Sequence, residues 1–398
     1  MPKMKFGTFL APHHPIAENP LLQLQSDLEF AKHLDHLGFD EFWCGEHHST
    51  GWEVIASPEL FLAAAAERTH RIKLGTGVIS LPYHHPFMVA QRLVQLDYQS
   101  RGRVIFGSGP GALPSDAHTI GIDPMVLRSR HDEAIGVIKR LFSGERFSYE
   151  SEWFTLKDAK LQLRPLQEQM EFVVASTFTP SGMTLSGKYN TGVISIGGMA
   201  SQGLKSLARQ WEFAEESALK HNNQISRNNW RVLMSWHIAE TRDQARAEAK
   251  DGLFRHNNEY STAVLNPIDG KIFKTPDEAI DSTAFSEDST AVIGTPDDLI
   301  HKIQEMIEIT GGFGAVIGFA HDWANRENTK KSWDLVARYV IPAINSMLGD
   351  YRDSYNFVIN NRDTWLRAKD ARFKNVAQHE SAAKVMETEG LEGEKPKN

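Results

Sequence analysis

The chain has 398 residues, of which 41% are hydrophobic and 24% charged, an ordinary composition for a soluble globular protein. Its formal net charge of -8 gives no electrostatic reason to expect binding to nucleic acid or to an anionic membrane. The single cysteine, Cys44, excludes an intramolecular disulfide and is typical of a reducing compartment. No run of 18 apolar residues is present, and the chain enters a predicted strand almost at once. We therefore expect a cytoplasmic protein.

Strand and helix signals alternate along the chain, with short apolar runs predicting strands and apolar residues at helical spacing predicting helices. In chain order the predicted elements are strand 4–10, helix 21–37, strand 39–44, helix 58–66, strand 72–79, helix 86–100, strand 103–107, helix 130–142, hairpin 147–156, strand 172–175, a helix from Pro180, strand 193–196, helix 204–220, strand 230–238, helix 242–260, strand 314–319 and helix 329–347. Eight strand candidates that alternate with helices favour an α/β fold, a TIM (β/α)8 barrel with insertions.

Two segments fall outside this pattern. Residues 265–292 are rich in Pro, Asp, Ser and Thr and show no helical stripe. A loop of that length inside a compact domain is usually functional or disordered, so we expect an insertion or lid there. Beyond residue 349 the chain turns polar, and residues 387–398 are typical of a frayed tail. The expected organisation is a barrel over residues 1–348 and a polar extension over 349–398.

Three pairs of adjacent histidines follow the first three predicted strands, namely His13-His14, His47-His48 and His84-His85. A barrel would gather these pairs at one rim, because the carboxyl ends of its strands meet there. Adjacent histidines project in different directions from extended backbone, and no Cys pair or His-x-x-x-His accompanies them, so we predict no metal site. The Glu46-His47-His48 stretch is better suited to hydrogen bonding or acid–base chemistry.

Two further stretches could approach a ligand. The run Gly107-Ser108-Gly109-Pro110-Gly111 would let backbone lie close to a flat or phosphorylated ligand, or would only supply a turn. It is neither a Walker loop nor the GxGxxG fingerprint. Ser176 and Thr177 follow strand 172–175 and precede a helix that begins near Ser181. Hydroxyl and backbone N–H groups at such a helix start suit a phosphate, or only cap the helix.

Together these motifs resemble the bacterial luciferase-like flavin-dependent monooxygenases, and most of all their limonene monooxygenase-type members. The resemblance covers residues 4–345 in order and rests on MKFGTFL at 4–10, GFDEFW at 38–43, EHH at 46–48, LGTGV at 74–78, GRVIFG at 102–107, VVAS at 173–176, GTP at 294–296 and VIP at 340–342.

The resemblance implies a TIM barrel that binds reduced flavin at its C-terminal mouth, with O2 adding at the flavin C4a carbon to give a peroxyflavin. His47 matches the catalytic histidine of the family, and Gly77-Val78 matches a cis peptide beside the flavin ring. Gly109 and Pro110 stand where luciferase has a cysteine and a phosphate-binding arginine, which leaves Arg130 and residues 176–182 as the matched candidates for the phosphate. The flavin-binding residues that it implies are Gly77, Val78, Gly107, Ser108, Gly109, Arg130, Ser176, Thr177, Ser181 and Gly182.

The resulting hypothesis is a monooxygenase that receives reduced FMN or FAD from a separate NAD(P)H-dependent reductase and works as a homodimer. Its substrate would be a small apolar molecule, with a cyclic terpene such as limonene as the leading candidate. Epoxidation and Baeyer–Villiger-type oxygen insertion remain open, because both start from the same oxygenated flavin. The alternatives are a deazaflavin-dependent oxidoreductase on the same barrel and an inactive flavin-binding partner subunit. The intact Glu46-His47-His48 argues against the inactive subunit.

Overall fold

The computed structural model describes residues 3–11, 13–177, 179–196, 201–265, 270–287 and 289–378, together with residues 384, 385 and 388. The chain divides into two compact units, Met1–Ile344 and Asn345–Asn398. The first unit contains the sheet and the site discussed below.

Eight parallel strands of the described residues close into a barrel in the order β1-β2-β3-β5-β8-β9-β10-β13, and β13 pairs with β1. These strands are β1 (Lys5–Leu10), β2 (Glu41–Cys44), β3 (Lys73–Thr76), β5 (Val104–Gly109), β8 (Glu171–Ser176), β9 (Gly192–Ser195), β10 (Trp230–Met234) and β13 (Ala315–Phe319). The predicted TIM barrel is confirmed.

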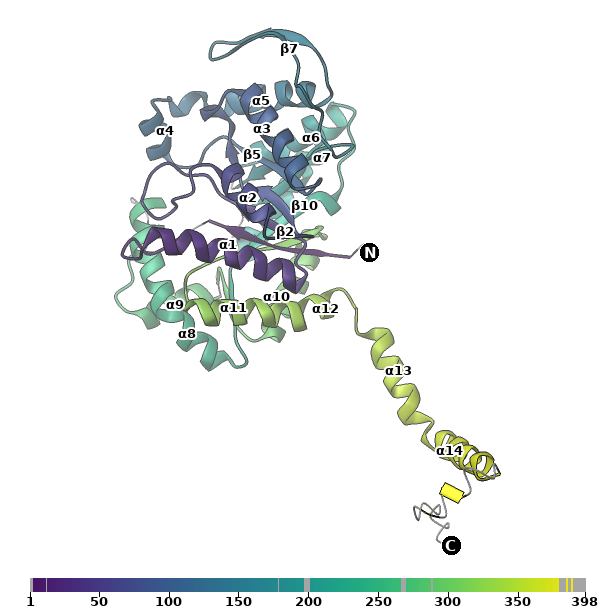
Figure 1. Cartoon of the computed structure of the whole chain (residues 1–398). Helices are drawn as coiled ribbons and strands as arrows, with labels where there is room; N and C mark the ends of the chain where they lie inside the picture. The colour runs from purple at the N-terminus through teal and green to yellow at the C-terminus, as the bar shows by residue number, and fades with distance from the viewer. Residues whose placement is uncertain are drawn as a thin grey trace. The chain divides into compact units, whose positions relative to one another are not determined.

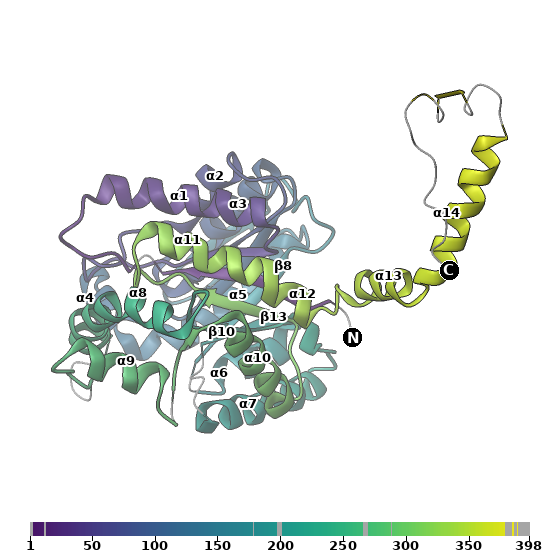
Figure 2. The ribbon, with the colours of Figure 1, turned by 90° about the horizontal axis from the view of Figure 1, so that it is seen from below.

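Helices lie outside the strands, as Figures 1 and 2 show. They are α1 (Pro20–Leu37), α2 (Pro58–Ala66), α3 (Pro86–Gln99), α4 (Pro114–Ile120), α5 (Leu127–Phe142), α6 (Ser181–Tyr189), α7 (Ser201–Lys220), α8 (Arg242–Arg255), the π-helical η4 (His256–Leu265), α9 (Pro276–Ala284), α10 (Pro296–Thr310), α11 (Arg326–Leu335), η5 (Val336–Val340) and α12 (Ile341–Ile344). Short extra strands are β4 (Ile79–Ser80), the hairpin β6 (Phe147–Glu150) and β7 (Thr155–Ala159), and the pair β11 (Trp236–Ile238) and β12 (Val292–Gly294).

Two apolar cores result from the alternation of side chains along each strand. On β8, Val173 points into the barrel, whereas its neighbours Phe172 and Val174 pack outward against the helices. The barrel interior is filled by buried side chains from the strands and the segment after β1, namely Phe9, Ala11, Trp43, Ile105, Val173, Ile194, Leu233, Ala315 and Ile317. This filled interior leaves room for a ligand only at the ends of the strands.

Several elements differ from the sequence prediction. The expected strand 230–238 breaks at Ser235 into β10 and β11, because β11 leaves the barrel to pair with β12. The expected helix 242–260 changes at His256 from α8 into the wider turns of η4. Residues 265–292 include the helix α9, so the expectation of no helix there was wrong. Parts of that segment, residues 266–269 and 288, lie outside the described residues.

The second unit includes the helices α13 (Gly349–Asn360) and α14 (Arg362–Ala377). Of the expected tail, residues 387 and 389–398 lie outside the described residues. Large apolar side chains of α13 are exposed, including Tyr351, Tyr355 and Phe357.

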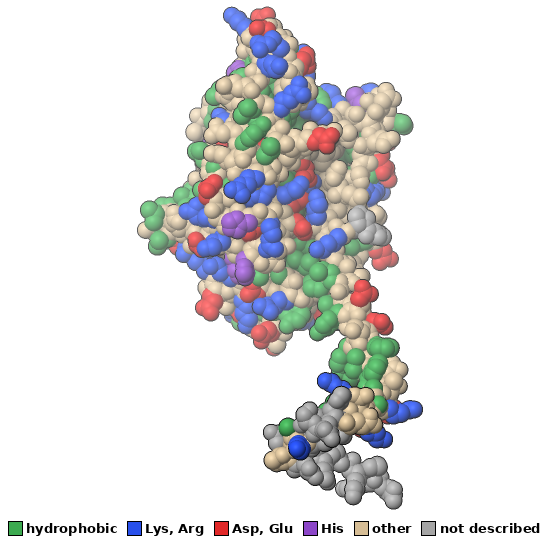
Figure 3. Space-filling view, turned by 45° about the vertical axis from the view of Figure 1, so that its right-hand side comes forward, with side chains coloured by type: hydrophobic (Ala, Val, Ile, Leu, Met, Phe, Trp, Pro, Cys, Tyr) green, Lys and Arg blue, Asp and Glu red, His purple; other side chains and the backbone are tan. Residues whose placement is uncertain are grey.

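On the face of the molecule in Figure 3, acidic and basic side chains are interspersed. None of the helices in the described part of the chain combines the length and apolar character that a membrane span requires.

Candidate active site

A cavity of about 860 Å³ lies at the carboxyl ends of the barrel strands, where TIM-barrel enzymes place their chemistry. Its volume falls within the range of about 300–1,000 Å³ that is usual for small-molecule sites. Most of its walls are apolar, and Tyr260 and Leu265 of η4 form one side. The apolar lining side chains from the strands, the loops that follow them and the helix starts are Phe9, Ala11, Val78, Leu113, Leu127, Ala175, Leu185, Ile194, Ile196 and Phe319.

His47 lines this cavity and is held at both ring nitrogens by buried carboxylates. Its Nδ1 lies 2.9 Å from Asp116 Oδ2, and its Nε2 lies 3.0 Å from Glu53 Oε2. Burial alone lowers the pKa of His47, but the hydrogen bonds and negative charges of Asp116 and Glu53 outweigh it and raise the pKa to about 10. His47 is therefore an imidazolium at neutral pH, unlike a histidine with the ordinary pKa of about 6.5.

Glu53 connects His47 to other groups of the cavity wall. Its Oε1 accepts a hydrogen bond from the Tyr260 hydroxyl and lies 3.3 Å from His13 Nε2. Burial raises the pKa of Glu53, but hydrogen bonds from His13 and His47 lower it well below its usual range. Glu53 therefore remains ionised although only 4% of it is exposed. Glu53 and Tyr260 were not predicted from the sequence, because 207 positions separate them and only the fold brings them together.

The members of each histidine pair point to different partners, as expected from extended backbone. His14 bridges Asp27 and Asp322, whereas His13 lines the cavity. His48 contacts Glu46, which also contacts His84 of the third pair at 2.7 Å. The three predicted pairs therefore contribute only His13 and His47 to the cavity wall.

Six of the ten residues expected to bind flavin line the cavity, namely Gly77, Val78, Gly109, Thr177, Ser181 and Gly182. The peptide bond between Gly77 and Val78 is cis, as the resemblance implied. A Cβ on Gly109 would lie 2.6 Å from Val78 Cγ2, and one on Gly77 would lie 2.8 Å from Phe9 Cε2. Glycine at these two positions therefore lets backbone itself form the wall.

The other four expected residues do not line the cavity. Gly107 is required for strand packing, since a Cβ there would lie 1.9 Å from the Thr76 carbonyl oxygen. Ser108 is buried, and its Oγ lies 3.0 Å from His131 Nε2. Ser176 is also buried, with its Oγ directed to the Thr179 carbonyl.

Arg130 is the fourth, and it lies in a separate groove between α5 and the β6–β7 hairpin. Its guanidinium is 5.1 Å from the centre of the Trp153 ring. Arg128 lines the cavity instead, because residues two apart on a helix point to different faces. Arg130, the predicted phosphate contact, therefore does not line this cavity, whereas Arg128 does.

Arg128 faces the cavity together with hydroxyl groups that precede and begin α6, those of Thr177, Thr179 and Ser181. The backbone N–H groups of the first turn of α6 have no helical partner and carry the positive end of the helix dipole. One cation, several hydroxyls and a helix N-terminus form a set of groups that suits a phosphate.

His131 also lines the cavity, one turn along α5 from Arg128. Burial lowers the pKa of His131 to about 4, and the nearby charge of Asp132 only partly opposes this effect. His131 is therefore neutral at pH 7, whereas His47 carries a positive charge.

A mostly apolar cavity with a charged histidine, at the strand ends of a closed (β/α)8 barrel, is the arrangement in which TIM-barrel enzymes place their active sites. The sequence model described as luciferase-like monooxygenase matches residues 4–312. The chain therefore belongs to the luciferase-like monooxygenase family and is an oxygenating oxidoreductase, which confirms the resemblance found in the sequence.

Two relatives match nearly the whole chain. 4-Hydroxyprotoasukamycin monooxygenase of Streptomyces nodosus subsp. asukaensis is 44% identical over 362 residues, which are 90% of this chain and 97% of that protein. Limonene 1,2-monooxygenase of Rhodococcus erythropolis is 41% identical over 387 residues, which are 97% of each.

Solved structures share the fold at lower identity. RslO1 from Streptomyces bottropensis, a monooxygenase, has a TM-score of 0.74 at 24% identity and covers 85% of this chain and 99% of its own. The oxygenating constituent of 3,6-diketocamphane monooxygenase from Pseudomonas putida, in complex with FMN, has a TM-score of 0.71 at 24% identity. It covers 85% of this chain and 98% of its own. An F420-dependent secondary alcohol dehydrogenase has a TM-score of 0.63 at 18% identity and covers 86% and 99%.

Proposed function

We propose that the cavity binds a reduced flavin and that the enzyme uses it with O2 to oxygenate a small apolar substrate, with a cyclic terpene such as limonene as the first candidate. The observation that carries this proposal is the arrangement of the cavity, with a phosphate-suited end at Arg128 and α6 and a backbone wall at Gly77, Val78 and Gly109. A flat ring system bearing a phosphate fits such a wall and such an end. The two relatives that match nearly the whole chain are both named monooxygenases, which supports oxygenation as the class of reaction.

When bound, the reduced flavin supplies the electrons that activate O2. His47 holds a proton at each ring nitrogen beside the cavity, and its positive charge offsets one of the two negative charges of Asp116 and Glu53. Glu53 and Asp116 keep the ring in one orientation. The apolar side chains of the cavity exclude water and provide the surface against which an apolar substrate packs.

Arg128 is proposed to hold the flavin phosphate, so Arg128→Ala should weaken flavin binding by roughly tenfold or more, since charge-assisted hydrogen bonds contribute about 1.5–3 kcal/mol. Isothermal titration calorimetry with FMN measures this change in the dissociation constant. Arg130→Ala is the matched control, because it removes the same charge from the same helix but away from the cavity. Equal losses in the two variants would contradict the placement of the phosphate.

The proposal includes a separate reductase and a homodimer. A flavin-dependent trigonelline monooxygenase of Acinetobacter baylyi, 27% identical over 168 residues, is named as an oxygenase component. A component of that kind needs a source of reduced flavin. The exposed apolar side chains of α13 provide surface that a partner could cover.

The function is tested by supplying reduced FMN or FAD, O2 and a panel of terpenes and cyclic ketones, and identifying products by mass spectrometry with 18O2. An oxygenated product that carries one labelled oxygen is expected. The alternative of a deazaflavin-dependent oxidoreductase is supported by the fold of the alcohol dehydrogenase. It predicts hydride transfer to or from the substrate without O2 consumption, so substrate conversion under anaerobic conditions would favour it.

A further inference from the structure

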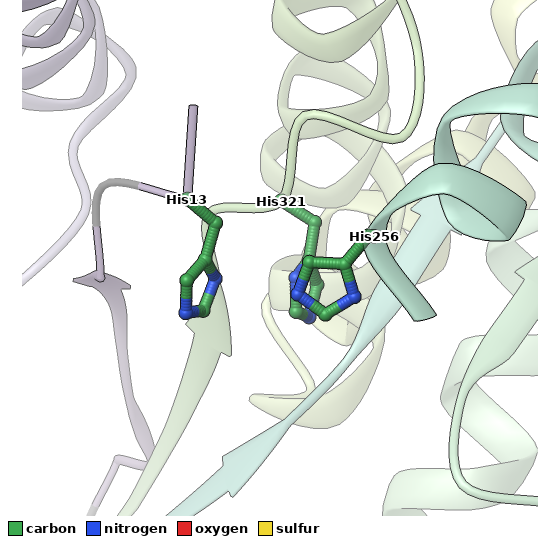
Figure 4. Close-up of side chains that lie close together, drawn as sticks. All are labelled: His13, His256 and His321. Atoms are coloured by element: carbon green, nitrogen blue, oxygen red, sulfur yellow. The ribbon is translucent and has the colours of Figure 1, made fainter. Parts of the chain in front are cut away.

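Three histidines that are distant in the sequence converge beside the cavity. His13 follows β1, His256 begins η4, and His321 follows β13. Their possible ligand nitrogens all lie within 4.8 Å of one another. Figure 4 shows the three rings side by side, each projecting from a separate segment of chain.

The nitrogens of this group are buried and largely unpaired. His13 Nδ1, His321 Nδ1 and both ring nitrogens of His256 are inaccessible and make no hydrogen bond of normal geometry with any described residue. The adjacent Asn257 directs its side chain elsewhere, because its amide nitrogen donates to Thr283 Oγ1 at 3.1 Å. A buried polar atom without a partner costs about 1–3 kcal/mol, so a cluster of such atoms calls for a ligand.

The opposite nitrogens of two of the rings are held as they are in metal sites. His13 Nε2 lies 3.3 Å from Glu53 Oε1, and His321 Nε2 lies 2.9 Å from Ser235 Oγ. Metal-binding histidines usually engage a carboxylate or another acceptor with one nitrogen, which orients the other nitrogen toward the metal. In both rings the nitrogen left over is Nδ1.

Aromatic packing alone does not account for this arrangement. The His13 and His256 rings lie 5.0 Å apart between centres, and His321 stacks on Trp323 at 4.1 Å. Phenylalanine would make such contacts without burying unpaired nitrogens. Three imidazole nitrogens instead match the preference of Zn²⁺ and related divalent metals for nitrogen ligands.

We propose that His13, His256 and His321 form a binding site for a divalent transition metal of the zinc class, with water as the fourth ligand. Zn–N distances of about 2.0–2.1 Å in a tetrahedral site place the nitrogens roughly 3.3 Å apart, so the rings must move inward by about 1–1.5 Å at most. The metal would connect η4 to the segments after β1 and β13. Because η4 carries Tyr260 and Leu265 of the cavity wall, metal binding would fix that wall.

The test uses the full chain purified without a histidine tag and dialysed against a chelator. Zn²⁺ titration with a competing chelator should show one tight equivalent per chain, and Co²⁺ should give the visible d–d absorption of a tetrahedral site. His256→Phe should weaken Zn²⁺ binding at least about a hundredfold and abolish the Co²⁺ spectrum, since even outer partners of metal ligands contribute 10–100-fold. The variant should fold, because phenylalanine fills the same space and removes two unpaired nitrogens; circular dichroism without metal checks this.

A second group could compete for metal in this assay, because Glu46, His48 and His84 also offer ligand atoms within 4.8 Å of one another. Glu46 already accepts both histidines of that group, at 2.8 and 2.7 Å. His84→Gln is therefore the matched control and should retain the tight Zn²⁺ equivalent. The proposal is overturned if the wild type takes up no stoichiometric Zn²⁺ at micromolar free metal. It is equally overturned if His256→Phe binds as tightly as the wild type, or if His84→Gln alone removes the site.

Discussion

Replacing His47 by glutamine should lower the rate of product formation by about 10²–10⁴-fold, the usual contribution of a positioned acid–base or charged group. Glutamine can keep the hydrogen bond that His47 makes to Asp116, but it carries no positive charge to pair with Glu53. Coupled turnover with reduced flavin, O2 and substrate, measured as product rather than O2 consumption, gives the effect. Flavin binding should survive, because the proposed phosphate contacts come from Arg128 and α6.

His48 provides the control for this experiment. It neighbours His47 in sequence but contacts Glu46 at 2.8 Å and is not part of the cavity wall. His48→Gln should therefore lower the melting temperature before it lowers turnover at saturating substrate. A His47→Gln enzyme with near-normal coupled turnover would show that the catalytic assignment is wrong.

The pH dependence of turnover separates two roles for His47. Because Asp116 and Glu53 raise its pKa to about 10, the ring keeps its charge throughout the neutral range. The stabilisation that this charged ring contributes is complete below the unfolded pKa of about 6.5 and is lost as the pH rises through about 10. Turnover that needs the imidazolium should stay level from pH 7 to about 9 and fall only toward 10. A loss centred near pH 6.5–7 would indicate an ordinary histidine that exchanges its proton freely.

The barrel could be predicted from sequence because its strands are short apolar runs bounded by helices with clear starts and stops. Helix α1, for example, begins after the capping residue Asn19 and ends at Gly38, which has a φ of 86°. The helix α10 was missed although its start carries a capping box between Thr295 and Asp298. Its neighbours β12 and α9 were missed because residues 265–292 lack the regular spacing on which the prediction depended.

The candidate site was predicted less completely than the fold, for a geometric reason. Residues that directly follow a strand, such as His47 and Gly77, could be placed at the rim from the strand alone. The partners of His47 could not be placed in this way, since Asp116 lies in the first turn of the separate helix α4, 69 positions away. Arg128 and Arg130 differ only in which face of α5 they occupy, and the start of that helix was predicted three residues too late. Pairings of this kind follow from tertiary structure rather than from local pattern.

A buried ion pair lies at the opposite end of the barrel interior. Arg231 on β10 donates from Nε to Glu41 Oε2 at 2.7 Å and from Nη2 to Glu41 Oε1 at 2.8 Å. Nη2 of Arg231 also donates to Glu171, and Trp43 Nε1 donates to Glu41 Oε2 at 3.0 Å. Arg231 is 1% exposed and Glu41 is not exposed at all. Both charges are therefore balanced only by one another and by a few neighbours.

Arg231→Met should lower the free energy of unfolding by about 3–5 kcal/mol, because removing one partner leaves the carboxylate of Glu41 buried without its main counterion. Burial alone lowers the pKa of Arg231, yet the charges of Glu41 and Glu171 outweigh it and raise the pKa above its normal value, which shows how strongly the site favours the charged pair. Urea denaturation followed by circular dichroism measures the change. The control is Arg326→Ala, which removes an exposed ion pair to Glu18 and should change stability little.

The double variant Arg231→Met/Glu41→Gln decides whether the loss comes from the unpaired charge or from missing packing. Glutamine keeps an oxygen acceptor for Trp43 Nε1 but carries no charge, so most of the stability should return. If the double variant is as unstable as Arg231→Met, the loss comes from the cavity left by the arginine side chain rather than from the buried charge. A single variant with wild-type stability would mean that Lys5, whose Nζ lies 3.7 Å from Glu41 Oε1, can replace the guanidinium as counterion.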